Sequence, residues 1–219
     1  MAPALDDPGA RANDRKGSGR ALAQKPRRIH ITGGPGSGKS TLAKRLSAAL
    51  NIPWYDLDRM ALDLEAKGVR PPFEALVAEL PGLVQNETWI SDGAYMAWAQ
   101  PLFDSADLVI WMDIPWHVAS LRIVIRHLKA EIARNNRFPG WRRLHRFWRW
   151  SNRYYNNRNS PGFYYGVPNN RADAVQWLEA YQSKLDICRT NADVTRVFER
   201  LTAPLHRKES PCHPSAFVA

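Results

Sequence analysis

The sequence predicts an α/β fold, a doubly wound sheet of five parallel strands flanked by helices. Short apolar or β-branched runs alternate with segments of helical periodicity along most of the chain. A glycine-rich segment follows the first of these runs and opens the first helix. Acidic residues end three of the strands, at Asp58, Asp92 and Asp113. In an open parallel sheet, ligands bind beyond the carboxyl ends of the strands, so these acids mark the expected site.

The glycine-rich segment organises the chain. It fits G-x-x-x-x-G-K-[ST] from Gly33 to Ser40, after a short strand over 28–32 and before a helix over 41–50. In that context the backbone N–H groups of the loop and the positive end of the helix dipole surround an anion. We therefore expect the loop to bind a nucleoside triphosphate. The residues expected to contact it are Gly33, Gly34, Pro35, Gly36, Ser37, Gly38, Lys39, Ser40 and Thr41.

Two side chains of this loop have expected roles in phosphoryl transfer. Lys39 reaches the β- and γ-phosphates, and the Ser40 hydroxyl ligates Mg²⁺. We expect Lys39 to be accessible to solvent in the free protein. The alternative interpretation is a Gly-rich turn with a surface lysine, which the complete motif and its strand–helix context disfavour.

The later elements alternate in the same way. The second strand lies within 52–58 and ends in acids, and a mixed polar segment follows it. A helix over 72–80 begins at a proline and ends at Pro81-Gly82. The other expected elements are strands over 88–91, 107–113 and 185–189, and helices over 116–134, 170–183 and 192–202. The strand over 107–113 is almost continuously apolar, which is typical of a parallel strand covered on both faces.

The helix over 116–134 carries two stripes of different character. Arg122, Arg126 and Lys129 recur at helical spacing on the basic stripe. The apolar stripe consists of Val118, Leu121, Ile125, Leu128 and Ile132.

A segment over 135–168 is dense in Arg, Trp, Tyr and Asn. Its basic stripe consists of Arg142, Arg146, Arg149 and Arg153, and its apolar stripe of Trp141, Leu144 and Trp148. We expect a helical, mobile lid that closes these arginines over phosphates; the alternative is a solvated charged face over an aromatic mini-core. The lid would be inserted in a domain over 27–203, with a disordered tail over 1–26 and a mobile tail over 204–219.

The composition of the chain limits the classes of partner that it can be expected to bind. The chain has 219 residues and a formal net charge of +10, which suits a nucleotide, another phosphate compound or nucleic acid. It has neither an apolar run as long as a membrane span nor a signal-peptide core, so no membrane partner is expected. Two cysteines, Cys188 and Cys212, give no disulfide framework, and we expect a cytoplasmic protein with Cys188 as a buried thiol.

The motifs exclude two classes of nucleotide-binding protein. A regulatory GTPase needs D-x-x-G after the phosphate loop and an N-K-x-D segment, and neither occurs. A motor ATPase usually ends an apolar strand in Asp-Glu, whereas Asp113 is followed by Ile114-Pro115. A small kinase remains.

At this point the chain resembles the adenylate-kinase-like P-loop kinases, especially the branch labelled DNA topology modulation (FlaR-related) proteins. The resemblance rests on Gly33–Thr41, on Trp89–Gly93, and on Leu108–Pro115 followed by Arg122 and Arg126. It implies an ATP-dependent phosphotransferase acting on a small acceptor.

The resemblance also implies roles for single residues. Asp92 helps to hold Mg²⁺, and Arg122 and Arg126 contact phosphates in the transition state. The stretch Thr190-Asn191-Ala192 would lie near the adenine. Adenylate kinase follows its Asp-Gly with Phe-Pro-Arg, whereas this chain has Ala94-Tyr95-Met96, so the acceptor is left open.

The residues themselves leave two further questions open. A carboxylate near the acceptor hydroxyl orients it or takes its proton; Asp58 is the candidate and Asp56 its competitor, while a helix cap or loop acid is the plainer interpretation of Asp58. The alternative interpretation of Asp92 is a turn residue before Gly93. Asp113 is interpreted as a helix cap or a structural acid. A second function, nucleic-acid binding with a regulatory ATP site, is favoured by the basic aromatic region 138–158.

Overall fold

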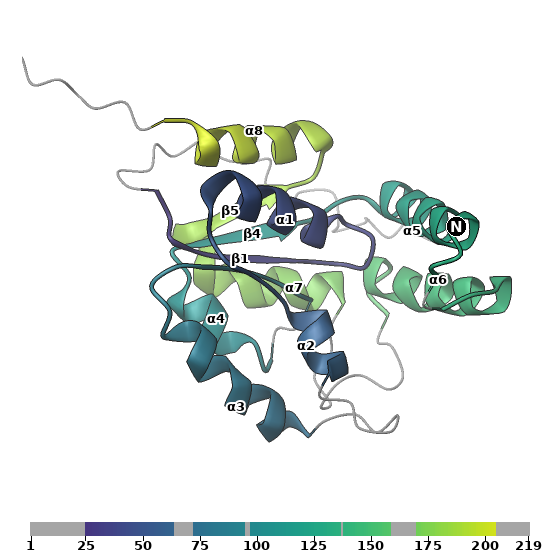
Figure 1. The fold of residues 1–219 in the computed structure, drawn as a ribbon, viewed down its shortest axis with the longest axis horizontal. Coiled ribbons are helices and arrows are strands. Elements are labelled where there is room, and N and C mark those ends of the chain that lie inside the picture. Colours follow the sequence, from purple (N-terminus) through teal and green to yellow (C-terminus); the bar gives the residue numbers. More distant parts are fainter. Residues whose placement is uncertain (1–24, 64–71, 95–96, 137, 159–169, 205–219) are drawn as a thin grey trace, which may run out of the picture.

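The computed structural model describes residues 25–63, 72–94, 97–136, 138–158 and 170–204. Within them, five parallel strands form one sheet in the order β2-β3-β1-β4-β5 (Figure 1). The strands are β1 (Arg28–Gly33), β2 (Trp54–Asp56), β3 (Trp89–Asp92), β4 (Leu108–Met112) and β5 (Leu185–Cys188). The strand that enters the phosphate loop is therefore central, and the chain has the P-loop NTPase fold that the sequence predicts.

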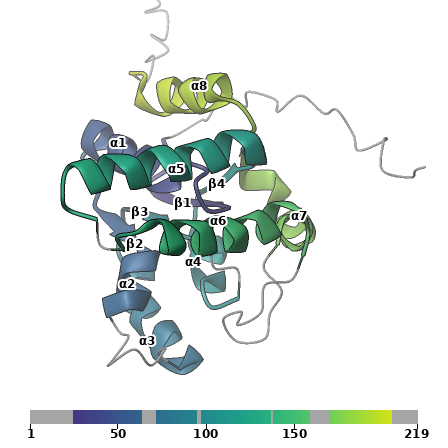
Figure 2. The same cartoon turned by 90° about the vertical axis from the view of Figure 1, so that its right-hand side faces the viewer.

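Helices cover both faces of the sheet (Figure 1). On one face lie α1 (Lys39–Leu50) and α8 (Asn191–Thr202). On the other lie α2 (Leu57–Asp63), α3 (Phe73–Val84), α4 (Gln100–Ser105), α7 (Arg171–Leu178) and a 3₁₀ helix (Glu179–Lys184). The two remaining helices, α5 (Trp116–Ile132) and α6 (Trp141–Tyr155), run side by side beyond the carboxyl ends of the strands, where the phosphate loop lies (Figure 2).

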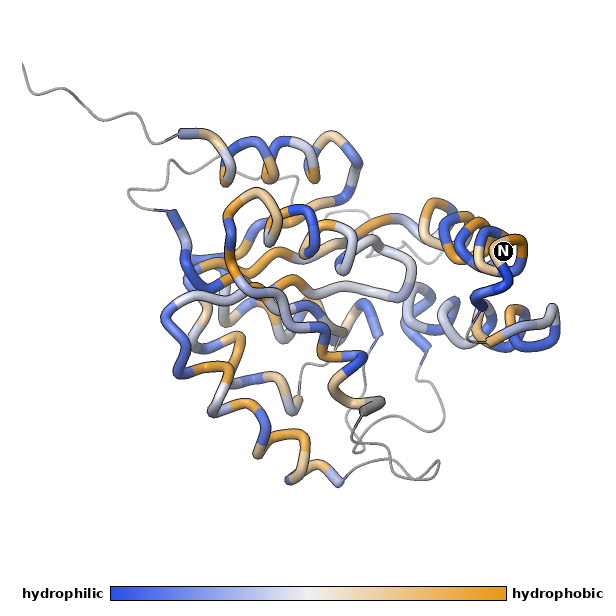
Figure 3. The backbone as a smooth tube through the Cα atoms, in the orientation of Figure 1, coloured by the Kyte–Doolittle hydropathy of each residue, from blue (hydrophilic) through white to orange (hydrophobic). Residues whose placement is uncertain are grey.

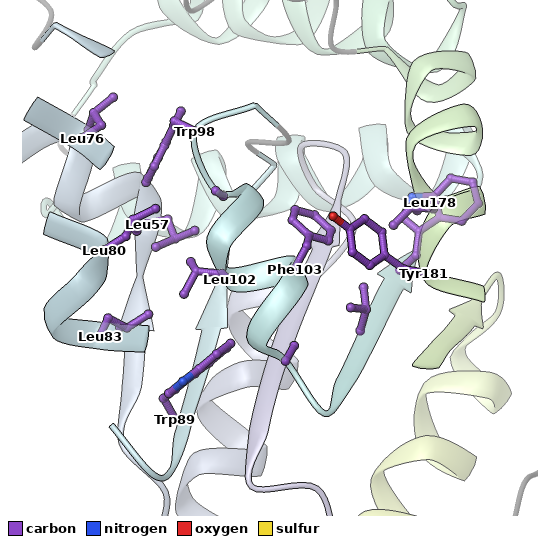
Figure 4. Packing of buried hydrophobic residues seen from close by; sticks show 14 of the residues in the cluster. Leu57, Leu76, Leu80, Leu83, Trp89, Trp98, Leu102, Phe103, Leu178 and Tyr181 are labelled. Atoms are coloured by element: carbon purple, nitrogen blue, oxygen red, sulfur yellow. The ribbon is translucent and has the colours of Figure 1, made fainter. Parts of the chain in front are cut away.

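The sheet separates two apolar clusters, and β4 shows how one strand serves both. Leu108, Ile110 and Met112 belong to the cluster beneath α1 and α8, whereas Val109 and Trp111 belong to the cluster beneath α3, α4 and α7. Figure 4 shows part of this second cluster, with Trp89 and Phe103 among its large side chains. Alternate residues thus point to opposite, equally dry faces, which explains the continuous apolar run in the sequence.

Two expected boundaries were wrong. The second strand ends at Asp56, and α2 begins immediately after it, so Asp58 lies in a helix rather than at a strand end. Pro81-Gly82 does not end α3, which continues to Val84. A proline inside a helix typically costs about 3 kcal/mol, but Leu80 and Leu83 are buried on either side of it, and this packing holds the last turn in place.

Most of the apolar stripe of α5 faces away from the core: Val118 packs partly against the core, whereas Leu121, Ile125, Leu128 and Ile132 are exposed. The buried residues of the helix are Ala119 and Ile123, on the opposite side. Figure 3 shows α5 at the periphery of the molecule with apolar residues along it. The spacing of the stripe correctly predicted a helix, but not which side of that helix packs against the body.

Several expectations fall wholly or partly outside the described residues. These are the disordered tail over 1–26, the mobile tail over 204–219 and the last part of the lid, from 159 onward. Within the described residues, no helix combines the length and the apolar character needed to cross a membrane.

Candidate active site

The phosphate loop joins β1 to α1 at the carboxyl edge of the sheet. Gly36 has a φ of 79° and Gly38 a φ of 101°, in the left-handed region that glycine adopts without strain. A Cβ on Gly36 would lie 2.6 Å from the carbonyl oxygen of Ala119, so only glycine fits between the loop and α5. Helix α1 begins at Lys39 with no side-chain cap and no acid in its first turn, which leaves its N-terminal N–H groups to an anion.

Lys39 lies inside the loop. The residue is 7% exposed, and its Nζ donates a hydrogen bond to the carbonyl oxygen of Gly34 at 3.3 Å. The expectation of a solvent-accessible Lys39 is therefore wrong, because the ammonium is turned back onto the loop backbone. An ammonium has three N–H donors, so this contact leaves two for phosphate oxygens.

Ser40 and Asp92 come together across the first turn of α1 and the end of β3. The Ser40 hydroxyl donates to Asp92 Oδ2 at 2.6 Å. Asp92 is completely buried, yet its other oxygen, Oδ1, accepts the Nε1–H of Trp54 at 2.6 Å. A hydroxyl and a carboxylate are ligands that Mg²⁺ accepts, so these two residues fit a Mg²⁺ ion beside the phosphates. Within the described residues, no group of three or more His, Cys, Asp or Glu side chains forms a separate metal cluster.

Burial perturbs the Asp92 carboxyl. Removal from water raises its pKa above the ordinary value, while the hydrogen bonds from Ser40 and Trp54 and the charge of Lys39 lower it and Asp56 raises it further. A divalent cation would favour the charged form, as Lys39 already does. Burial therefore disfavours the charged form of Asp92, and a bound cation would stabilise that form.

Trp54 is a site residue that the sequence did not reveal. Its indole lies on β2, donates to Asp92, and is covered by the ammonium of Lys44 at 4.8 Å from the ring centroid. The partner residue is 38 positions away, so no local pattern marks the contact. The sequence contains one indication of this role: Trp54 lies two residues before Asp56 on a strand, so the two side chains share one face of the sheet.

The two candidate acceptor acids lie in different places. Asp56 is half-buried at the end of β2 and directly opposite Asp92 in the sheet register. Its Oδ1 accepts the backbone N–H of Arg59 at 3.0 Å, which caps the start of α2. Asp58 is exposed in the first turn of α2. The structure therefore brings Asp56 to the Ser40–Asp92 pair more closely than Asp58.

Arg122 and Arg126 have unlike surroundings. Arg122 donates to the carbonyl oxygen of Ser37 through Nη1 and to Asn191 Oδ1 through Nη2, both at 2.6 Å. It thereby ties the phosphate loop to the start of α8, where the nucleobase is expected. Arg126 is exposed one turn further along α5, with its guanidinium carbon 6.0 Å from the centroid of the Phe147 ring.

The end of α6 rests on the phosphate loop. The Tyr155 hydroxyl donates to the carbonyl oxygen of Pro35 at 2.9 Å, and the Tyr154 ring lies against Gly34. Trp116 joins this contact, because its ring lies 5.1 Å from those of both Trp148 and Tyr155. Burial raises the pKa of Tyr154 to about 12, so its hydroxyl stays neutral at physiological pH. This part of the expected lid is therefore packed against the phosphate loop.

Asp113 is a buried acid held in ion pairs. Arg171 donates to both of its oxygens, at 2.6 and 2.8 Å, and Arg189 approaches at 3.4 Å. Of the two interpretations of Asp113, these ion pairs fit the structural acid, and Asp113 does not cap α5, whose N-cap is Pro115 without a side-chain hydrogen bond. Arg171, which the sequence did not single out, joins the start of α7 to the end of β4 beside the phosphate loop.

No protein-family model matches the chain. It is 35% identical over 96 residues to the uncharacterized protein YqaC of Bacillus subtilis (strain 168), a match that covers 43% of this chain and spans about half, 53%, of that protein.

Two solved structures are similar in part. Shikimate kinase from Bacteroides thetaiotaomicron is 15% identical with a TM-score of 0.41, over 80% of this chain and 96% of that one. Shikimate kinase from Aquifex aeolicus is 19% identical with a TM-score of 0.41, over 80% and 95%. These values are too low to add to what the strand order and the phosphate loop show of the fold.

Proposed function

We propose that this protein is a Mg²⁺-dependent kinase that transfers the γ-phosphoryl group of ATP to a small acceptor. The observation that carries the proposal is the 2.6 Å contact between Ser40 and the buried carboxylate of Asp92, directly behind the phosphate loop. The same edge of the sheet carries a lysine folded into the loop and a second carboxylate, Asp56. Phosphoryl transfer needs this combination of positioned cations and a carboxylate more than it needs covalent chemistry.

The residues of the chain have separable roles in this proposal. Ser40 and Asp92 would hold Mg²⁺, which would supply positive charge to neutralise the phosphates. Lys39 exchanges its bond to the Gly34 carbonyl oxygen for phosphate oxygens. Arg122 holds the loop to the start of α8, so that the nucleobase and the phosphates are positioned together. Arg126 would leave the Phe147 ring and contact the phosphates, as the resemblance to adenylate-kinase-like kinases implies.

We assign the acceptor-orienting carboxylate to Asp56 rather than Asp58. Asp56 lies opposite Asp92 in the sheet and is half-buried, whereas Asp58 is exposed to solvent. A base must lie within hydrogen-bond reach of the proton that it removes, and exposure to bulk water weakens its orientation. The role of Asp58 remains the alternative.

Closure over the nucleotide would come from part of the segment 135–168 only. Tyr154 and Tyr155 already contact the phosphate loop, so the C-terminal end of α6 acts as a fixed wall. The exposed arginines of α6 would then approach phosphates by movement of its N-terminal half. Protection from hydrogen exchange across α6 on addition of an ATP analogue and Mg²⁺ is the expected result.

The second candidate is nucleic-acid binding with a regulatory ATP site. It is favoured by α6, which contains no Asp or Glu and exposes basic and aromatic side chains together: Arg142, Arg143, Arg146, Arg149, Phe147 and Trp150. Single-strand binding that weakens steeply with salt, without ATP turnover, would support it.

A turnover screen distinguishes the two functions. ADP formation from Mg-ATP is measured with nucleoside monophosphates, nucleosides and small alcohols as acceptors. The kinase proposal predicts acceptor-dependent ADP formation that Asp56→Asn lowers at least about tenfold, as for loss of a general base, while Asp58→Asn serves as the matched control. Acceptor-dependent ADP formation unchanged in Asp56→Asn and lost in Asp58→Asn would return the role to Asp58. An unchanged rate of ADP release with every acceptor class would refute the kinase.

A further inference from the structure

Helix α5 exposes an apolar face on the side away from the sheet. The exposed fractions are 59% for Leu121, 41% for Ile125, 37% for Leu128 and 82% for Ile132. Ala119 and Ile123, which pack against Gly36 of the phosphate loop, lie on the opposite side of the helix. Figure 2 shows α5 on the face of the molecule turned toward the viewer. Exposed apolar faces of this extent mark interaction surfaces in soluble domains.

The spacing of this face is that of a coiled-coil seam. The exposed apolar residues recur at intervals of four, three and four: Leu121, Ile125, Leu128 and Ile132. Val118 continues the spacing at the N-terminal end but packs partly against the core of its own chain. Ile125 and Ile132 then occupy a positions and Leu121 and Leu128 occupy d positions. β-Branched residues at a with leucine at d favour two parallel strands. A stripe that merely covered solvent-facing helix surface would not need this register.

We propose that this seam packs against the same seam of a second copy, as a parallel pair of α5 helices around a two-fold axis. The longer segments outside the described residues supply no other partner of that pattern: 1–24, 64–71, 159–169 and 205–219 contain no run of four large aliphatic residues at heptad spacing. A second copy has the required pattern by definition, and where the two-fold axis runs along the helices each seam residue meets its own counterpart.

The residues beside the seam fit the parallel arrangement. Lys129 flanks the seam at an e position, whereas Arg122, at the preceding e position, directs its guanidinium to Ser37 and Asn191 instead. In a parallel pair e faces g, and Lys129 would lie along Val124 of the second copy, where its aliphatic stem covers apolar surface. The bodies point outward, because the sides of the two helices that bear Ala119 and Ile123 face away from the seam.

The net charge gives this interface a distinctive salt dependence. Each copy carries a formal charge of +10, so two copies repel each other at low ionic strength. Salt screens that repulsion and leaves the apolar contact intact, so dimerisation strengthens with salt. Binding of α5 to an anionic partner would weaken with salt instead. One helix pair is smaller than a standard interface, so we expect dissociation in the micromolar range.

Sedimentation of the full chain at 1–100 µM (roughly the range where such interfaces dissociate), in low and high NaCl, tests the proposal. We expect a monomer–dimer equilibrium that shifts toward dimer in high salt. Ile125→Glu buries an unpaired charge in the seam and should weaken the dimer by about 100-fold or more. Trp150→Glu, at an equally exposed (41%) position outside the seam, is the matched control and should leave the dimer unchanged. Circular dichroism confirms that both variants are folded.

Cross-linking fixes the orientation. In a Cys212→Ser background, Leu121→Cys should form a disulfide with its own counterpart under mild oxidation. Cys188 should not compete for this disulfide, because it is buried. In an antiparallel pair Leu121 would instead lie opposite Ile132, about 16 Å along the helix from its counterpart and beyond disulfide reach. A monomer at every concentration, a dimer indifferent to Ile125→Glu, or no Leu121→Cys cross-link would overturn the proposal.

Discussion

Replacing Gly34 by alanine tests the contact between α6 and the phosphate loop. A Cβ on Gly34 would lie 2.5 Å from Tyr154 Cε1, 2.6 Å from Tyr154 Cδ1 and 2.7 Å from the Tyr155 hydroxyl oxygen. Carbon atoms in contact normally stand about 3.5–4.0 Å apart, so the overlap is on the order of 1 Å. Tyr154 is 8% exposed and cannot turn aside. The end of α6 must therefore move away from the loop.

The loss of folding free energy in Gly34→Ala has two sources. Overpacking of this size costs about 1–3 kcal/mol, and loss of the Tyr155–Pro35 hydrogen bond costs about 1 kcal/mol more. For a chain of this length, roughly 2–4 °C of Tm is lost per kcal/mol. We therefore expect Gly34→Ala to lower the Tm by roughly 5–15 °C, measured by thermal unfolding followed by circular dichroism.

The matched control is Gly82→Ala. Gly82 lies inside α3 with no atom within 4 Å of the added Cβ. Alanine in a helix interior gains about 0.5–1 kcal/mol over glycine, so this variant should be slightly more stable than the parent. The double variant Gly34→Ala/Tyr154→Ala should lose less stability than the sum of its single variants. A Gly34→Ala protein as stable as the parent would show that α6 does not rest on the loop.

Three further predictions concern single side chains. Asp92→Asn should lose turnover yet unfold at a higher temperature at pH 7, since burial raises the pKa of Asp92. In the parent, Asp92 makes the folded state less stable as the pH rises from the ordinary carboxyl pKa to the raised one, and the variant should lack this pH dependence. The same dependence of Tm on pH in the variant would argue against this cause. Asp113→Asn breaks the bidentate pair with the partly exposed Arg171 and should cost about 1–3 kcal/mol by urea unfolding; a smaller loss would mean that the pair is not formed in solution. Burial raises the pKa of the Cys188 thiol to about 12, so it should resist iodoacetamide at pH 8 until the chain is unfolded, and rapid labelling of the native protein would contradict its position in the core.

The sequence predicted the central part of the fold because the relevant patterns are local. Strand, glycine loop and helix over 28–50 form one contiguous motif, and its chemistry requires that geometry. The place of Asp92 at the end of β3 followed from the same kind of pattern, a short apolar strand followed by Asp-Gly. The pairing of Asp92 with Ser40 then follows from the topology of the parallel sheet.

The parts that escaped prediction depend on contacts between distant segments. The Tyr155–Pro35 hydrogen bond joins residues 120 positions apart, and the inward turn of Lys39 depends on the loop carbonyl that it meets. Helical periodicity identified α5, but the neighbours of a helix decide which stripe is buried, and here they bury Ala119 and Ile123. Proline at position 81 is a local stop signal that burial of flanking leucines overrides.

The central claim is that Ser40 and Asp92 form the Mg²⁺ end of an ATP site. Calorimetric titration with ATP, with and without Mg²⁺, tests it most directly, in the parent and in Ser40→Ala and Asp92→Asn. We expect Mg²⁺ to tighten ATP binding to the parent about tenfold or more, and we expect both variants to bind ATP without that gain. A parent that binds no ATP, or variants that keep the full gain from Mg²⁺, would contradict the claim.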